Sequence, residues 1–429
     1  MFSETLTPRA KRDIHPMHGR DLPAGEYDAR TLFLLLLLLR LMSEGFDLYL
    51  GSPLSLILSL GLISLSTAMF IKQGSFPRRA LVTLCSFLAL TFSAILSFLF
   101  NYEFETQYQL DSIVQNLLYL SVFLTASSSH FERRHLKFFL KGIVVVTVIE
   151  ALFSIYQVST NTGFLMPDFG WSRARGLSSH PVPLSIKLFA LIAFTYAFRK
   201  FISKRWEFTF YFASAISLTL TFSRTGWGIV LLWMAYIAWR SKQKGSGATM
   251  LIVGVPLVVS LLLWSGRFDD LITVTSFIER GGYREIDLTD IGNSFEWRLQ
   301  HWYALVMTGL ERPLIGFGPG TSEFLNRFGL KAHNSAIDTF VEQGFFGLVT
   351  IFALFCSVFF SSRKALRIPI EPVSSRYQLQ SLSNVLFFGF VSAMLISVSL
   401  FNQTLNMVLF FLLFGLMINL RTRTAWTTG

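Results

Sequence analysis

The segment RPLIGFGPGTSEFLNRFGLKAHNSAIDTFVEQGFFG, from Arg312 to Gly347, is the most polar and turn-rich stretch of a chain that is otherwise mostly apolar. It contains the histidine His333 and a glycine-proline run at 316–320, and it continues directly into an apolar stretch that begins at Val341. Glycine and proline at this density interrupt regular structure and form tight turns. A transporter or a structural membrane protein has little need for such a segment, whereas an enzyme that acts at a membrane surface does, so we interpret the segment as part of a candidate active site.

The composition around this segment is that of a membrane protein. Of the 429 residues, 52% are hydrophobic and only 15% are charged, whereas a soluble domain carries about a quarter charged residues. The two cysteines, Cys85 and Cys356, lie inside apolar runs, so we expect neither a disulfide nor a metal cluster. The first thirty residues lack the short apolar core of a signal peptide, so the first span is expected to remain as an anchor.

Membrane spans are predicted from the apolar runs, since a spanning helix needs about 20 apolar residues. The twelve candidates are 31–50, 53–71, 80–100, 111–127, 138–158, 183–199, 206–222, 225–240, 249–265, 341–361, 378–400 and 404–420. The sequence therefore predicts an all-α polytopic membrane protein with about twelve transmembrane helices.

The distribution of Lys and Arg supports this count. Basic residues gather in both terminal tails and in every second loop, and the alternating loops contain few of them. Because cytoplasmic loops are enriched in Lys and Arg, both termini are predicted to be cytoplasmic. We read the net charge of +11 first as this topology signal and expect no nucleic acid partner. The long loop between spans nine and ten, residues 266–340, then lies on the outer face.

This outer loop is predicted to be helical in part. Asn293 and Glu296 resemble a helix cap and predict a helix over 294–311, and a short helix is expected near 321–328. The pattern Ser335-Ala336-Ile337-Asp338 predicts a capping box at the start of the tenth span. His333 would precede that cap by two residues, at a positive helix end that disfavours the imidazolium form. A neutral imidazole could act as a general base, or the ring could only fasten the loop through a hydrogen bond.

Several arginines lie on the outer side, against the topology trend. Arg224 falls between spans seven and eight, where it could meet an anion at exposed backbone N–H groups or extend to lipid head groups. Arg298 lies beside aromatic residues on the predicted outer helix, and it could bind a diphosphate or be a solvated charge. Arg173 and Arg175, near Lys187, form a second basic group on the same side. This group could belong to the same anion site or could only contact lipid head groups.

Two further patterns concern acids inside spans. Arg40 and Glu44 lie one helical turn apart in the first span and are predicted to pair. Glu150 lies within the fifth span, where an acid is a functional candidate or a hydrogen-bonded structural group.

In order along the chain, these residues resemble the O-antigen ligase and polymerase superfamily of bacterial envelope glycosyltransferases. The resemblance rests on LTFSRTG at 220–226, on Arg298 with Trp302 running on to RPLIGFG at 312–318, and on HNS at 333–335 with EQGFFGL at 342–348. RARGL at 173–177 resembles an earlier outer loop of the family. The close similarity covers about 171–350.

The resemblance implies a membrane glycosyltransferase of the GT-C type in the bacterial inner membrane. Such enzymes move glycan from an undecaprenyl-diphosphate carrier to an acceptor hydroxyl on the periplasmic face, with no metal or nucleotide cofactor. Arg224 and Arg298 would then hold the diphosphate and His333 would activate or orient the acceptor. The residues that would bind diphosphate or glycan are Arg173, Arg175, Lys187, His301, Trp302 and Glu342.

The implied domain organisation follows the topology. A cytoplasmic tail (1–30) precedes spans one to nine (31–265), a periplasmic loop with the catalytic segment (266–340), spans ten to twelve (341–420) and a second cytoplasmic tail (421–429). The acceptor expected first is the lipid A core, which would make the protein an O-antigen ligase. Polymerisation of repeat units onto a second carrier-linked glycan is the alternative, and a polysaccharide flippase or twelve-span transporter is a more distant one. Convergence of Arg224, Arg298 and His333 on one cavity would favour the enzyme.

Overall fold

The computed structural model describes residues 28–51, 53–73, 76–166, 171–223, 226–231, 294–326, 329–366, 383–384, 386–391, 393–395 and 404–419. Its elements are α1 (Ala29–Leu50), α2 (Leu54–Gln73), η1 (Arg78–Ala80), α3 (Leu81–Phe100), α4 (Thr106–Ser128), α5 (Arg133–Ser159), β1 (Phe164–Met166), β2 (Trp171–Arg173), α6 (Pro181–Phe198), η3 (Arg199–Phe201), α7 (Lys204–Leu220), α11 (Ser294–Gly309), η4 (Ser322–Leu325), α12 (Ser335–Leu366) and α14 (Thr404–Ile418).

The described helices confirm an all-α polytopic membrane protein. Six of them are long and apolar enough to cross a membrane, and they correspond to α2, α3 with η1, α4, α5, α6 with η3, and α12. α1 and α7 also coincide with predicted spans, but α1 carries Arg40, Glu44 and Asp47, and α7 has only 17 residues. The predicted span 249–265 and most of 225–240 and 378–400 lie outside the described residues, so the count of twelve stays a prediction.

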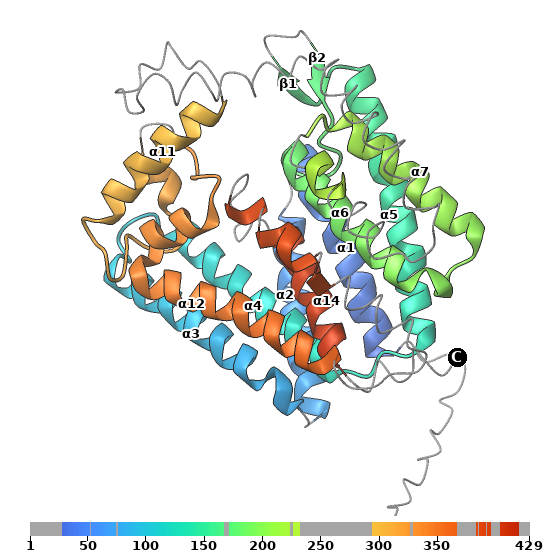
Figure 1. The fold of residues 1–429 in the computed structure, drawn as a ribbon, viewed down its shortest axis with the longest axis horizontal. Helices are drawn as coiled ribbons and strands as arrows, with labels where there is room; N and C mark the ends of the chain where they lie inside the picture. Colours follow the sequence, from blue (N-terminus) through green and yellow to red (C-terminus); the bar gives the residue numbers. More distant parts are fainter. Residues whose placement is uncertain are drawn as a thin grey trace, which may run out of the picture.

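The helices form two groups that are joined through the middle of the molecule (Figure 1). α3 packs on α12 and α4, while α5 packs on α7 and α1. α14 contacts α4, α12 and α6, and α2 lies between α1 and α4. α11 lies on the first part of α12, and the antiparallel pair β1–β2, in which Phe164 is opposite Arg173, lies on the other group. The helix α11 and the β1–β2 pair therefore lie across from each other at the same end of the molecule (Figure 1).

A break in α12 attaches the segment after α11, which begins at Arg312, to the helices of this fold. Gly344 has φ 65° and ψ −163°, so the helix is interrupted there. The freed groups pair with the segment after α11: Phe345 N donates to the Pro313 oxygen (2.7 Å), and Gly318 N donates to the Glu342 oxygen (2.9 Å). An added Cβ at Gly344 would come within 2.2 Å of the Leu314 carbonyl carbon. The PLIGFG segment (313–318) and the EQGFFG segment (342–347) are therefore hydrogen-bonded to each other, and we call this pair the interlocked turn.

The start of α12 corrects one prediction about capping. The cap is Asn334 rather than Ser335, because the Asn334 Oδ1 atom accepts from Ala336 N (3.0 Å) and Ile337 N (3.3 Å). The Asp338 Oδ1 atom accepts from Ala332 N (2.9 Å). His333 is consequently the residue directly before the cap. The predicted helix at 294–311 is α11, and the short helix expected near 321–328 is the 3₁₀ turn η4.

Candidate active site

One wall of the site is the loop that follows β2. Arg173 Nε donates to the Thr221 oxygen (2.8 Å), and Ala174 N donates to the Leu220 oxygen (2.9 Å). These bonds attach the RARGL block to the end of α7, immediately before Ser223. Arg224, which the sequence made a central candidate, lies outside the described residues. The anchoring nevertheless brings the two blocks on either side of α6 together.

Two buried polar side chains of α5, Gln157 and Glu150, accept hydrogen bonds from the backbone of the same loop. The Gln157 Oε1 atom accepts from the backbone of both Arg175 and Gly176 (2.9 Å each), and the Glu150 Oε2 atom accepts from Leu177 N (2.8 Å). Gly176 has φ +54°, and a Cβ there would come within 2.1 Å of the Glu150 Oε2 atom. Glu150 is therefore a hydrogen-bonded structural acid, as one of the two readings of the sequence predicted.

Lys187 belongs to this internal support. Its side chain is 1% exposed, and its ammonium forms an ion pair with Glu150. The expectation of an outer basic group that includes Lys187 is wrong in this respect, because α6 is enclosed along almost its whole length. Its predicted contact with substrate stays a prediction, and the structure gives it a positioning role.

The second wall is α11 with residues 329–334. Trp302 Nε1 donates to the Ala332 oxygen, and His301 Nε2 lies 3.1 Å from the Leu330 oxygen. The Trp297 ring stacks on His301 (5.1 Å between centroids) and meets His333 edge-on (5.8 Å). His301 and Trp302 thus hold the backbone that leads into His333.

His333 has an unusual backbone conformation for its type. Its φ of 53° lies in the left-handed region, which residues other than glycine rarely adopt. Phe222, two residues before Arg224, has the same feature with φ 47°. Such conformations cost on the order of 1 kcal/mol or more and concentrate at functional sites. Both segments that the sequence selected as central contain one.

Glu342 lies deeper and has internal partners. Its side chain is buried, and its Oε1 atom accepts from Ser322 N at 3.4 Å. Its backbone oxygen accepts from Ser97 Oγ (2.7 Å) as well as from Gly318 N. The contact of Glu342 with substrate stays a prediction, whereas its place in the interlocked turn is clear.

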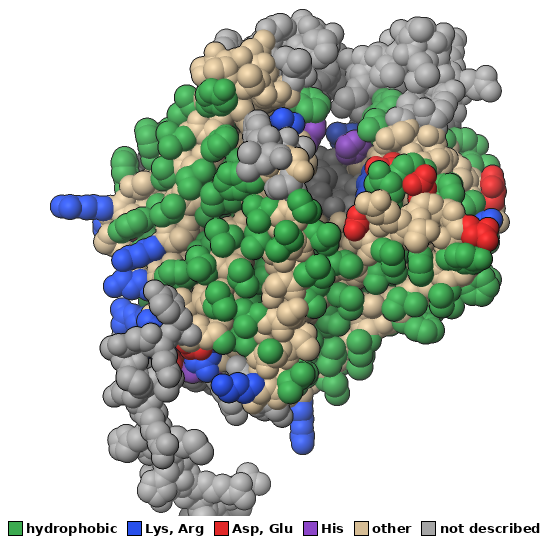
Figure 2. Space-filling model, turned by 180° about the vertical axis from the view of Figure 1, so that it is seen from behind, with side chains coloured by type: hydrophobic (Ala, Val, Ile, Leu, Met, Phe, Trp, Pro, Cys, Tyr) green, Lys and Arg blue, Asp and Glu red, His purple; other side chains and the backbone are tan. Residues whose placement is uncertain are grey.

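The two walls meet at a pair of histidines. Burial, followed by the charges of Arg173, His333, Arg298 and Arg175 in that order, lowers the pKa of His180 to about 3. Burial, followed by the charges of Arg298 and His301, lowers the pKa of His333 to about 4. Such interactions require proximity. Figure 2 shows histidine and Lys or Arg side chains side by side in a hollow of this face.

The neutral state predicted for His333 therefore has a different main cause. The sequence suggested the positive end of α12, but desolvation and the Arg298 guanidinium are the causes that dominate. His180 was missed as a candidate. It caps α6, with its Nδ1 atom accepting from Val182 N (3.3 Å), and its ring contacts Phe164 (4.4 Å between centroids). The only signal in the sequence was a His-Pro pair at the start of a span.

The arrangement combines guanidinium groups with two neutral imidazoles. Guanidinium groups bind phosphates in a bidentate manner, and a neutral imidazole can accept a proton. Within the described ranges no group of three or more His, Cys, Asp or Glu side chains could hold a metal ion. The chemistry that these residues support is binding of a di-anionic group next to a proton acceptor.

A family model described as O-antigen ligase matches residues 209–352. No curated protein matches the chain. The matched region runs from within α7 to within α12, so it contains Arg224, Arg298, His333 and Glu342 and leaves Arg173, Arg175 and His180 outside.

Proposed function

We propose that this membrane protein, whose residues 209–352 match a family model described as O-antigen ligase, transfers glycan from an undecaprenyl-diphosphate carrier to an acceptor hydroxyl on the periplasmic face of the inner membrane. The observation that carries the proposal is the hollow in which histidine and Lys or Arg side chains lie side by side (Figure 2), together with the effect of the Arg173, His333, Arg298 and Arg175 charges on the pKa of His180. A transporter or flippase does not require a proton acceptor among fixed cations.

The arginines act on the donor. Arg298, Arg173 and Arg175 bind the diphosphate and stabilise the charge that develops on it as the bond to the sugar breaks. Arg224, which follows a segment hydrogen-bonded to the Arg173 loop, contributes to the same anion site. In this proposal no metal takes part, because guanidinium groups supply the positive charge.

His333 acts on the acceptor. As the acceptor oxygen bonds to the anomeric carbon, the oxygen of the carrier diphosphate leaves with its electron pair and the acceptor proton passes to the neutral imidazole. Undecaprenyl diphosphate departs, and the imidazolium then releases its proton to water. A single displacement of this kind inverts the anomeric centre. A pKa of about 4 keeps the imidazole ready as a base near neutral pH.

We place ligation to the lipid A core first, with polymerisation of repeat units as the alternative that uses the same donor. Both reactions are tested by a surface-glycan gel from cells that carry His333→Ala or Arg224→Ala. Each variant is expected to abolish transfer while the protein remains in the membrane, as an immunoblot checks. Loss of a ligase leaves long carrier-linked chains unattached, whereas loss of a polymerase leaves single repeat units on the core.

Arg134→Ala is the matched control, because Arg134 is 59% exposed and pairs only with the exposed Glu132 among the ion pairs of the described residues. It should leave the gel unchanged. Full activity of His333→Ala would disprove the role of the base, and full activity of Arg224→Ala would remove that residue from the anion site.

A further inference from the structure

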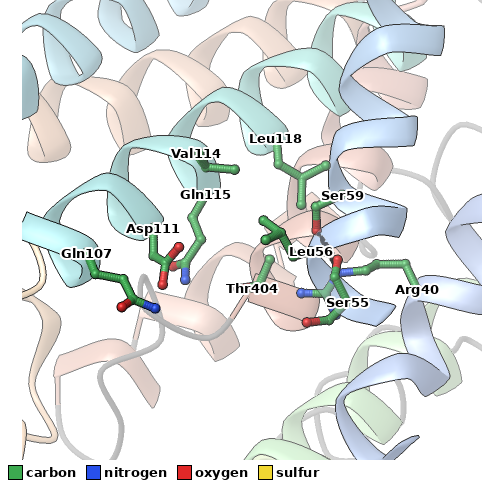
Figure 3. Close-up of a pocket in the computed structure, with 10 residues that line it drawn as sticks. All are labelled: Arg40, Ser55, Leu56, Ser59, Gln107, Asp111, Val114, Gln115, Leu118 and Thr404. Carbon is green, nitrogen blue, oxygen red and sulfur yellow. Dashed lines mark hydrogen bonds between the residues drawn. The ribbon is translucent and has the colours of Figure 1, made fainter. Parts of the chain in front are cut away.

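A second polar cavity lies away from the histidines. It has a volume of about 210 Å³ and lies among α1, α2, α4 and the start of α14. Figure 3 shows Gln107, Asp111 and Gln115 pointing into it from α4, with Arg40 reaching in from the opposite side. Ser55, Ser59 and Thr404 complete the polar part of the lining.

The side chains from α4 form a stripe. Gln107, Asp111 and Gln115 are spaced four residues apart, so they share one face of the helix. α4 is one of the helices apolar enough to span a membrane. Asp111 and Gln115 fall within the predicted span 111–127, where polar and ionisable groups are costly and mark functional paths by default, and Gln107 precedes it by one turn. A row of three that ends in a cavity therefore calls for a polar occupant.

Arg40 is built into the cavity wall. Its side chain is almost fully buried, its Nε atom donates to Ser59 Oγ (3.0 Å), and its Nη1 atom donates to Ser43 Oγ (3.0 Å). Glu44, the partner expected from the sequence, is 3.9 Å from Nη1. A guanidinium has more N–H donors than these two hydrogen bonds use. The serines fix the group in place and leave it able to donate into the cavity.

The lining selects a class of ligand. It offers donors from Arg40, donors and acceptors from two glutamine amides and the hydroxyls, and an acceptor from Asp111. The carboxylate of Asp111 disfavours an anion, and the combination of these polar groups with Leu56, Val114 and Leu118 suits a sugar ring, which has polar edges and apolar faces. A sugar ring carries hydroxyl groups that both donate and accept, and the volume suits a single monosaccharide.

The helix α14 contacts both the cavity and the first turn of α6. Thr404 lines the cavity, and Asn406, two residues further on, donates through Nδ2 to the Pro183 oxygen (3.3 Å). Pro183 lies in the first turn of α6, which His180 caps. We propose that this cavity is a glycan subsite that binds one neutral monosaccharide ring of a glycan whose reacting end lies between His180 and His333. This inference rests on the proposed function.

The test uses the purified full-length protein in detergent and the oligosaccharide released by mild acid from the cells' own carrier lipid. Saturation-transfer NMR is expected to show binding to the wild type and loss of binding in Gln115→Leu and Asp111→Asn. In transfer assays the KM for glycan should rise about fivefold per lost hydrogen bond of about 1 kcal/mol, with kcat within about twofold. Leu56→Trp, which fills the cavity from α2, should act like the polar variants.

Glu103→Gln is the control, since Glu103 is an exposed acid that accepts a hydrogen bond from Tyr102 and does not line the cavity. Failure of the proposed function appears as absence of transfer by the wild type, and NMR then still decides the subsite. Absence of binding to the wild type, or equal binding to Gln115→Leu, Asp111→Asn and Leu56→Trp, would overturn the subsite whatever the transfer assay gives. An unchanged thermal midpoint separates loss of the subsite from unfolding.

Discussion

Lys187→Met removes the cation from a buried ion pair beneath the candidate active site. The Lys187 and Glu150 side chains are 1% and 0% exposed, and Glu150 also accepts a hydrogen bond from Leu177 N. After the substitution the carboxylate keeps that hydrogen bond but loses its counter-ion in a site without water contact. Breaking a buried pair by removing one partner costs about 3–5 kcal/mol.

The double variant Lys187→Met, Glu150→Gln should recover most of that loss. The glutamine carbonyl can still accept from Leu177 N, and no charge stays buried. Replacement of a buried pair by neutral groups of similar volume is often close to neutral, so a net loss of about 1 kcal/mol or less is expected. The loop that carries Arg175 and Gly176 would keep its shape in the double variant and shift in the single one.

Unfolding by SDS in mixed micelles, followed by tryptophan fluorescence, measures these differences in free energy. Lys204→Met is the matched control, because Lys204 pairs with Glu207 while its own side chain is 90% exposed. An exposed pair of this kind contributes less than about 1 kcal/mol. If Lys187→Met is within about 1 kcal/mol of the wild type, or if the double variant is as unstable as the single one, the reasoning is refuted.

Three shorter predictions concern the wall that carries His333. The unfolded chain takes up a proton on this histidine near pH 6.5 and the folded chain near pH 4, so its contribution to stability falls as pH drops through that window; His333→Gln should show a shallower loss of thermal midpoint from pH 6.5 to 4. Asn334→Ala should cost about 1 kcal/mol of stability through the lost cap, with Asn334→Asp restoring most of it in the same unfolding assay. Gly344→Ala should prevent accumulation of folded protein on immunoblots, because φ +65° and the 2.2 Å approach to Leu314 leave no room for Cβ.

Much of the scaffold was predictable from local sequence. The apolar runs placed α1 to α7, α12 and α14 within a few residues, because a spanning helix must satisfy its backbone internally and show apolar side chains to lipid. The helix α11 was predicted in a different way, from the cap pattern of Asn293 and Glu296. The position of the cap on α12 was missed by one residue, since Asn334 and Ser335 are both good caps and only the tertiary bond from Asp338 to Ala332 N decides between them.

The composition of the site was less predictable than the scaffold. His333 and Arg298 were selected as candidates because a histidine and an arginine stand out in a polar loop, and their roles stay predictions. His180 was missed because it follows a short loop and opens a span like any capping residue, and its proximity to His333 is a consequence of packing alone. Lys187 was assigned to the outer face because its position at the start of a span does not reveal that α6 is enclosed on all sides.

Charged residues of both walls affect the pKa of His180. The wall of α11 and His333 lies within the region that matches the O-antigen ligase family, and the wall of Arg173 to His180 lies before it. Yet the largest charge effect on the pKa of His180 comes from its own wall, through Arg173, and the next comes from His333 across the site. Both imidazoles remain neutral near neutral pH because, besides the cost of desolvation, a proton on His180 would meet Arg173, Arg298 and Arg175, and a proton on His333 would meet Arg298. Binding of a diphosphate would offset that positive charge and raise both histidine pKa values, so the donor itself would prepare His333 to accept the acceptor proton.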